Sequence, residues 1–95
     1  MTAMQRGEAE TVAVEVLGWM AGQEEVIARF IAASGATPDD LRRAAGDAEF
    51  LGFVLDHLMG DEAALLACCE DLGLAPEAPG RARAGLPGGD LPHWT

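Results

Sequence analysis

The sequence predicts an all-α protein, and three observations support that fold class. Apolar residues make up 49% of the chain, and Ala and Leu, which favour helices, are prominent among them while β-branched runs are absent. Apolar side chains recur at three- and four-residue spacing, which is the period of an amphipathic helix. Glycines and capping residues separate these segments. We therefore expect the 95 residues to form one compact bundle of five to six short helices.

The first half of the chain predicts three helices. The first extends from Glu8 to a break at Gly22, with apolar residues along one face. The second covers about residues 23–35 and ends in a glycine, which suits a left-handed cap. The third begins at Thr37-Pro38-Asp39-Asp40 and reaches about Ala45. That start combines a hydroxyl cap, a proline in the first turn and two acids that favour the helix dipole.

The second half predicts two further helices and leaves a sixth open. Residues 48–59 and 61–73 each carry an apolar face and are each followed or closed by glycine. By analogy with the first half, a sixth helix should begin at Pro76. Pro79-Gly80 falls inside it, so the alternative is a shorter helix over 79–84.

The chain also repeats itself at a constant offset. Val16-Leu17 recurs as Val54-Leu55, and Gly35 recurs as Gly73, each 38 residues later. A period of this size is typical of a duplicated helical unit rather than of a reaction site. The shared positions are core and capping residues, so a helix-packing unit is predicted to be duplicated. The expected organisation is a flexible N-terminal tail at 1–7, one all-α domain at 8–84 with internal copies at 8–45 and 46–84, and a Gly/Pro-rich tail at 85–95.

Charge and composition exclude several classes of function. The formal net charge is −10, and all six basic residues are arginine. Phosphate backbones and anionic membranes need clustered cations, so nucleic acid and membranes are disfavoured, whereas a basic protein partner suits the chain. The apolar runs are too short to cross a bilayer, and the N-terminus lacks an apolar signal segment. These features predict a cytoplasmic protein.

The cysteines and histidines do not predict a catalytic or metal site. Cys68 and Cys69 are neighbours on a helix, where their side chains diverge, so they are interpreted as small buried side chains in a reducing cytoplasm. His57 has Asp56 nearby but no nucleophile placed beside it, and His93 lies in the tail. We therefore predict no catalytic residues, no cofactor, no metal and no enzymatic activity.

Residues 30–44 resemble the outline of a helix-turn-helix, with Gly35 in the turn. Their second helix begins Pro38-Asp39-Asp40, and its first turn would be presented to DNA. Only Arg42 and Arg43 offset these acids, so DNA binding is disfavoured. A regulator linked to nucleic acid, either through this segment or as an acidic mimic, is kept as the alternative function.

Protein–protein interaction is the leading hypothesis. The predicted first and fourth helices are apolar around more than half their circumference, which exceeds what one small bundle buries. An adapter or interaction module, with a homodimer as one form, would use that surface. The candidate interface residues are Trp19, Phe50, Phe53, His57 and Trp94.

Several helix patterns with capping prolines resemble one known family. The matching residues are Phe30-Ile31, Pro38-Asp39-Asp40-Leu41-Arg42, Phe50-Leu51, Val54-Leu55-Asp56, Asp61-Glu62, Leu65-Leu66 and Gly73-Leu74-Ala75-Pro76-Glu77. Over about residues 9–86 the chain resembles domain-of-unknown-function family 3572, which consists of short helical bacterial proteins. The resemblance implies a helical domain without an assigned reaction, so it implies no functional residues.

Overall fold

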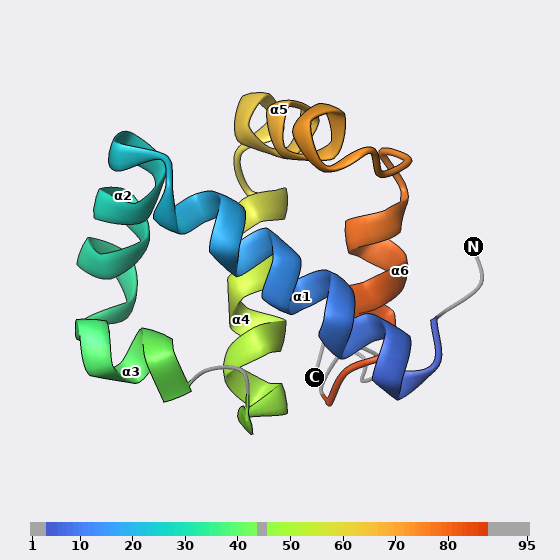
Figure 1. Ribbon diagram of the computed structural model, residues 1–95, viewed down its shortest axis with the longest axis horizontal. Helices are drawn as coiled ribbons and strands as arrows, with labels where there is room; N and C mark the ends of the chain where they lie inside the picture. Colours follow the sequence, from blue (N-terminus) through green and yellow to red (C-terminus); the bar gives the residue numbers. More distant parts are fainter. Residues whose placement is uncertain (1–3, 44–45, 88–95) are drawn as a thin grey trace, which may run out of the picture.

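The described residues form six α-helices and the segments that connect them, and they contain no strand. This confirms the all-α fold class. The computed structural model describes residues 4–43 and 46–87 (Figure 1). The helices are α1 (Arg6–Ala21), α2 (Glu24–Ser34), α3 (Pro38–Arg43), α4 (Ala48–Met59), α5 (Glu62–Leu72) and α6 (Ala78–Ala84).

Helix α1 is the central element of the bundle. It crosses in front of α4 in Figure 1, with α2 and α3 to one side and α5 and α6 to the other. Its most extensive contacts are with α6 and α4. The Cα radius of gyration is 12.3 Å, close to the value of about 12 Å for one folded domain of this length. The expected compact bundle is therefore confirmed.

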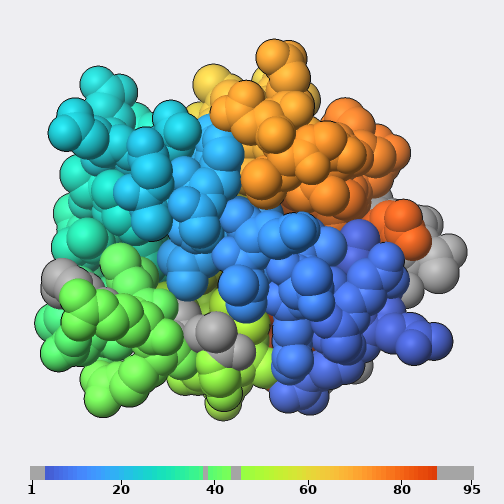
Figure 2. Space-filling model, in the orientation of Figure 1, coloured from blue at the N-terminus to red at the C-terminus, as the bar shows by residue number. Residues whose placement is uncertain are grey.

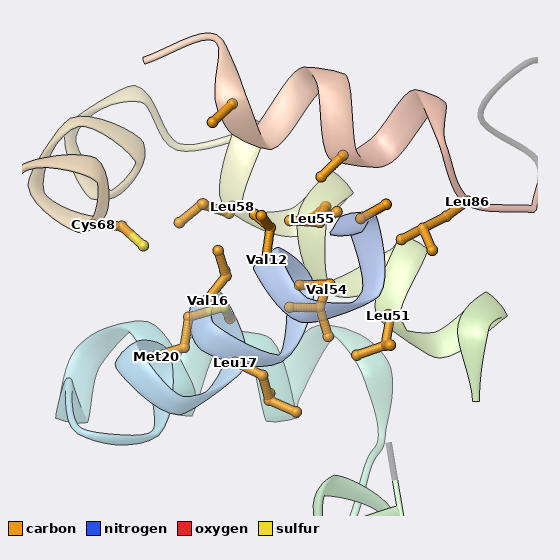
Figure 3. Close-up of a cluster of buried hydrophobic side chains, with 14 of the residues drawn as sticks. Val12, Val16, Leu17, Met20, Leu51, Val54, Leu55, Leu58, Cys68 and Leu86 are labelled. Carbon is orange, nitrogen blue, oxygen red and sulfur yellow. The ribbon is translucent and has the colours of Figure 1, made fainter. Parts of the chain in front are cut away.

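The hydrophobic core lies between α1 and α4 (Figure 3). Val16 and Met20 on α1 and Leu55 and Leu58 on α4 are fully buried, and Cys68 of α5 closes one end. Burying a side chain of this size contributes about 1.5–3 kcal/mol, so the contact between α1 and α4 supplies much of the favourable free energy of folding. The outer face of α1 stays exposed between the flanking helices (Figure 2).

Side chains and glycines define the helix ends as their types predict. The Asp47 carboxylate caps α4, because its Oδ1 accepts hydrogen bonds from the backbone N–H groups of Glu49 and Phe50 at 3.0 and 3.2 Å. Gly35 and Gly73 follow α2 and α5 with φ of 71° and 70°. This left-handed conformation disfavours every residue that has a Cβ.

The N-terminal boundary differs from the expected flexible tail at 1–7. Helix α1 begins at Arg6, and Met4 is buried in the core with its backbone N–H donating to the Arg81 carbonyl at 3.1 Å. The prediction was wrong for residues 4–7, because the contact that orders them comes from the distant α6. At the other end Leu86 is also buried, while residues 88–95 of the predicted tail lie outside the described residues.

The last helix covers Ala78–Ala84 rather than beginning at Pro76. Pro79 lies in its first turn, where a missing backbone N–H breaks no helical hydrogen bond. The shorter alternative over 79–84 is therefore close to the structure. Helix α6 is held to α4 by Arg83, whose Nε donates to Asp56 Oδ1 at 2.8 Å.

The two halves share the boundaries of their second helices but differ in packing. Helices α2 and α5 have equal lengths, and both their first and last residues are separated by the 38-residue offset. Helix α6, however, packs extensively on both α1 and α4, whereas α3 makes no comparable contact with either. The third helices are therefore not equivalent, and the origin of the chain from two copies stays a prediction.

Replacing Gly73 by alanine should destabilise the protein by about 1–2 kcal/mol, because a Cβ is strained at this positive φ. Urea denaturation measures the change. Gly18→Ala is the control, since that helical glycine has no atom within 4 Å of an added Cβ and should gain up to about 1 kcal/mol. Equal changes in both variants would contradict the assignment of strain to Gly73.

Candidate functional site

An aromatic cluster joins α2 to α4. Phe50, Phe53 and His57 follow each other at three- and four-residue spacing on α4, which places them on one face of that helix. Phe30 of α2 packs against all three rings, with centroid distances of 5.8, 5.6 and 5.2 Å. The contacts with Phe50 and His57 are edge-to-face, a favoured arrangement for aromatic pairs. We call these four residues the aromatic cluster.

The aromatic cluster reaches from the core to the surface. Phe30 is fully buried, Phe50 and His57 are half-buried, and Phe53 is 40% exposed. A rigid aromatic ring that is partly exposed beside two others provides contact area at little entropic cost. This exposed edge is suited to packing against an apolar side chain of another molecule.

An open pocket of about 530 Å³ borders the cluster at His57. Its walls carry both charges, because Arg29 Nη2 donates to Asp61 Oδ2 at 2.8 Å across the pocket. The Asp61 carboxylate also accepts from the Ala64 backbone N–H, so it caps α5 as well. The pocket therefore places the Arg29–Asp61 ion pair beside an aromatic edge, and Asp61 also has a structural role as the cap of α5.

The candidate interface residues from the sequence divide into three groups. Phe50, Phe53 and His57 lie together in the aromatic cluster. Trp19 lies elsewhere, half-buried on α1, where its Nε1 donates to Asp71 Oδ2 of α5 at 2.7 Å. Trp94 lies outside the described residues.

Phe30, which holds the cluster together, was not among the candidates. Its place on the apolar stripe of α2 predicted burial, but only the tertiary structure shows that it packs against three rings of α4. No local sequence signal connects these two helices. The same holds for Arg83, whose partner Asp56 is far from it along the chain.

The two cysteines are free and buried, as their positions predicted. Burial raises the pKa of the Cys68 thiol to about 12, with smaller contributions from Cys69 and Asp71. Burial also raises the pKa of Cys69, with a smaller contribution from Glu77. Neither thiol is activated toward nucleophilic attack, because that requires a lowered pKa.

The buried Cys68 thiol should make stability depend on alkaline pH. The unfolded thiol ionises near its ordinary value of 9.0, whereas the folded one holds its proton to about pH 12. The stabilisation is therefore complete below about pH 9 and is lost as pH rises from there toward 12. Urea denaturation from about pH 8 to pH 11 should show this fall, at up to about 1.4 kcal/mol per unit. Cys68→Ala should flatten it, and an unchanged slope in that variant would exclude Cys68 as its source.

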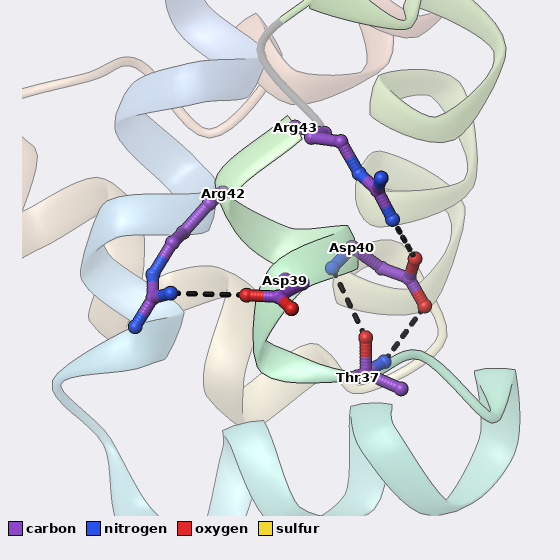
Figure 4. A network of polar contacts seen from close by, with 5 residues as sticks. All are labelled: Thr37, Asp39, Asp40, Arg42 and Arg43. Carbon is purple, nitrogen blue, oxygen red and sulfur yellow. Dashed lines mark hydrogen bonds and ion pairs between the residues drawn. The ribbon is translucent and has the colours of Figure 1, made fainter.

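The arginines of the helix-turn-helix-like segment are neutralised locally (Figure 4). Arg42 pairs with Asp39 at 3.0 Å, and Arg43 pairs with Asp40 at 3.1 Å. The pKa of Asp40 is lowered, first by the hydrogen bond from the Thr37 backbone N–H and then by Arg43. Helix α3 therefore lacks the net positive face that a DNA-reading helix needs. Ala44 of this segment lies outside the described residues.

The described residues offer neither a metal site nor a membrane-spanning helix. Over residues 4–43 and 46–87, no group of three side chains from His, Cys, Asp and Glu is arranged to hold a metal ion. Within the same part of the chain, none of the helices has the length and apolarity needed to span a membrane.

The fold and the cluster define a small helical domain with a partly exposed aromatic edge. The model of the family described as "Protein of unknown function (DUF3572)" matches residues 6–89. The chain belongs to this family, which confirms the resemblance seen in the sequence. Searches of the curated proteins and of the solved structures found no match.

Proposed function

We propose that this protein acts by binding another protein through the exposed edge of the aromatic cluster. The observation that carries the proposal is Phe53, which is 40% exposed although Phe30 and Phe50 pack against it. Aromatic side chains held rigidly at a surface are enriched among residues that dominate binding energies. The partner is either a second copy of the chain, which would give a homodimer, or a different protein, for which this chain would act as an adapter.

The proposed role is binding rather than catalysis, and the proposed location is the cytoplasm. The packing of His57 edge-on against Phe30 supports a structural use of this histidine. The free thiols of Cys68 and Cys69 suit a reducing compartment. The pairing of Arg42 and Arg43 with acids disfavours a DNA reader, so the nucleic-acid alternative reduces to acidic mimicry, for which the net charge of −10 is the only support.

Photo-crosslinking in the native host tests the binding proposal. A photo-reactive benzoylphenylalanine in place of Phe53 should form a covalent adduct with a protein. The same group in place of Leu66, which is 50% exposed on α5, is the matched control and should not. An adduct of twice the chain mass would identify the homodimer, and a different mass would identify another partner. Equal labelling from both positions, or no adduct from position 53, would contradict the proposal.

A further inference from the structure

We propose that the outer face of α1, with its groove against α3, is a second docking surface that accepts a basic amphipathic helix of another protein. It is separate from the aromatic cluster, which lies between α2 and α4. The groove has a volume of about 360 Å³. It is lined by Val14, Leu17, Gly18, Ala21, Leu41 and Arg42.

The exposed line along α1 carries no charge. Its members recur at three- and four-residue spacing and extend for about 21 Å along the helix. Val14 is 38% exposed, and the others are exposed as well. A solvent-facing line on a central helix is ordinarily polar. These residues are Gly7, Thr11, Val14, Gly18 and Ala21.

Gly18 is not required by the chain itself. It lies inside α1 with a helical backbone, and an added Cβ would meet no atom within 4 Å. Glycine in such a place destabilises a helix relative to alanine, and nothing within the described fold compensates for it. A second helix crossing at Gly18 would benefit, because a missing side chain lets two helix axes approach to about 8 Å.

The two flanks of this line differ in character, and the difference specifies the partner. Toward α3, Leu17 and Leu41 make an apolar wall. On the opposite flank, Glu8 and Glu15 lie two turns apart on the side of α1 that carries Trp19, the partner of Asp71 on α5. Neither glutamate forms an ion pair with any described residue. A partner helix with apolar residues on one side and Lys or Arg on the adjacent side would complement both flanks. Its apolar side would meet the leucines, and its basic side would meet the glutamates.

The remaining charges near the groove cancel each other. Arg42 pairs with Asp39 at 3.0 Å, and Glu10 pairs with Arg6 at 3.1 Å. The net charge of the face is therefore negative. A second copy would bring the same acidic flank and a charge of −10, so coulombic repulsion favours a basic partner over self-association.

Binding of a defined peptide to the full chain tests this docking surface. The probe is a synthetic peptide of about 20 residues that repeats Leu-Lys-Lys-Leu-Ala-Lys-Lys and spans about 30 Å as a helix. Fluorescence anisotropy measures its affinity, and amide chemical shifts of the isotope-labelled protein locate it. We expect the shifts on α1 and α3. A peptide with Glu at every Lys is the charge control and should bind at least about tenfold more weakly.

Matched variants separate the docking surface from non-specific attraction. Gly18→Leu should weaken binding at least about tenfold, because its side chain fills the crossing point. Ala67→Leu on α5, which is also an exposed helical position, should not. Glu8→Gln with Glu15→Gln should weaken binding about threefold to tenfold, whereas Glu49→Gln with Glu62→Gln should change it less than twofold. Gly18→Ala is the control for misfolding. It should raise thermal stability while weakening binding, so the weaker binding could not result from unfolding.

Three outcomes would overturn the docking proposal. They are unchanged affinity in the folded Gly18→Leu variant, equal weakening by both glutamine pairs, and shifts centred on α4 or α5. Sedimentation of the chain alone gives a fourth: a dimer that Gly18→Leu dissociates would make the second copy the occupant. None of these variants alters Phe53, so this surface and the aromatic cluster can fail independently.

Discussion

Replacing Phe30 by alanine should destabilise the protein by about 3–5 kcal/mol, the loss typical of removing a fully buried phenylalanine. The ring is the one that contacts all three of Phe50, Phe53 and His57, so its removal leaves a cavity bordered by these side chains. Each aromatic pair adds about 0.5–1.5 kcal/mol beyond area burial, which places this variant at the upper end of the range.

Urea denaturation, followed by tryptophan fluorescence, measures this effect. Phe53→Ala is the matched control, because that ring belongs to the same cluster but is 40% exposed, and it should cost clearly less. A loss from Phe30→Ala no larger than that from Phe53→Ala would show that α2 is not held to α4 by this ring. Phe30→Leu should recover part of the loss, since it restores volume without the edge-to-face contacts.

Replacing Gly85 by alanine should destabilise the protein by about 1–3 kcal/mol, and by more if the backbone cannot move. The reason is space rather than conformation, because Gly85 has φ of −86°, which any residue adopts. An added Cβ would collide with the backbone carbonyl oxygen of Met4 and would lie 3.1 Å from the Cβ of Ala9. Both obstacles are fixed parts of the chain, so relief requires moving the N-terminal segment away from α6.

Gly60→Ala is the control for this prediction. Gly60 follows α4 as Gly85 follows α6, and its φ of −78° is nearly the same. An added Cβ there would lie 3.5 Å from the nearest atom, which is ordinary van der Waals contact, so the change should be within about 0.5 kcal/mol. Similar losses from both variants in thermal denaturation would contradict the collision with Met4.

The helices were predictable where local chemistry decides them. Asp47 caps α4, and Gly35 and Gly73 adopt the left-handed conformation that their positions after apolar stretches indicated. The burial of Met4 and the packing of α6 against α1 were not predictable, because both depend on contacts between opposite ends of the chain. Periodicity reports which residues are apolar on one face, and it carries no information about distant partners.

The candidate site was predictable in part for the same reason. The sequence named Phe50, Phe53 and His57 as interface candidates, and the structure places these three together on one face of α4. The sequence also grouped Trp19 with them as an interface candidate, whereas the structure pairs Trp19 with Asp71 on a different side of α1. Which aromatic face meets another is decided by helix packing, which composition and spacing do not specify.

The contact between α1 and α6 has a consequence for synthesis on the ribosome. Helix α1 emerges first, yet it packs most extensively on α6, which emerges last, and Met4 is hydrogen-bonded to Arg81. Its apolar side therefore has no complete partner until nearly the whole chain has left the exit tunnel. We therefore expect the core to form only once α6 has left the tunnel, rather than helix by helix, and we expect a chain truncated before α6 to be captured by chaperones or degraded.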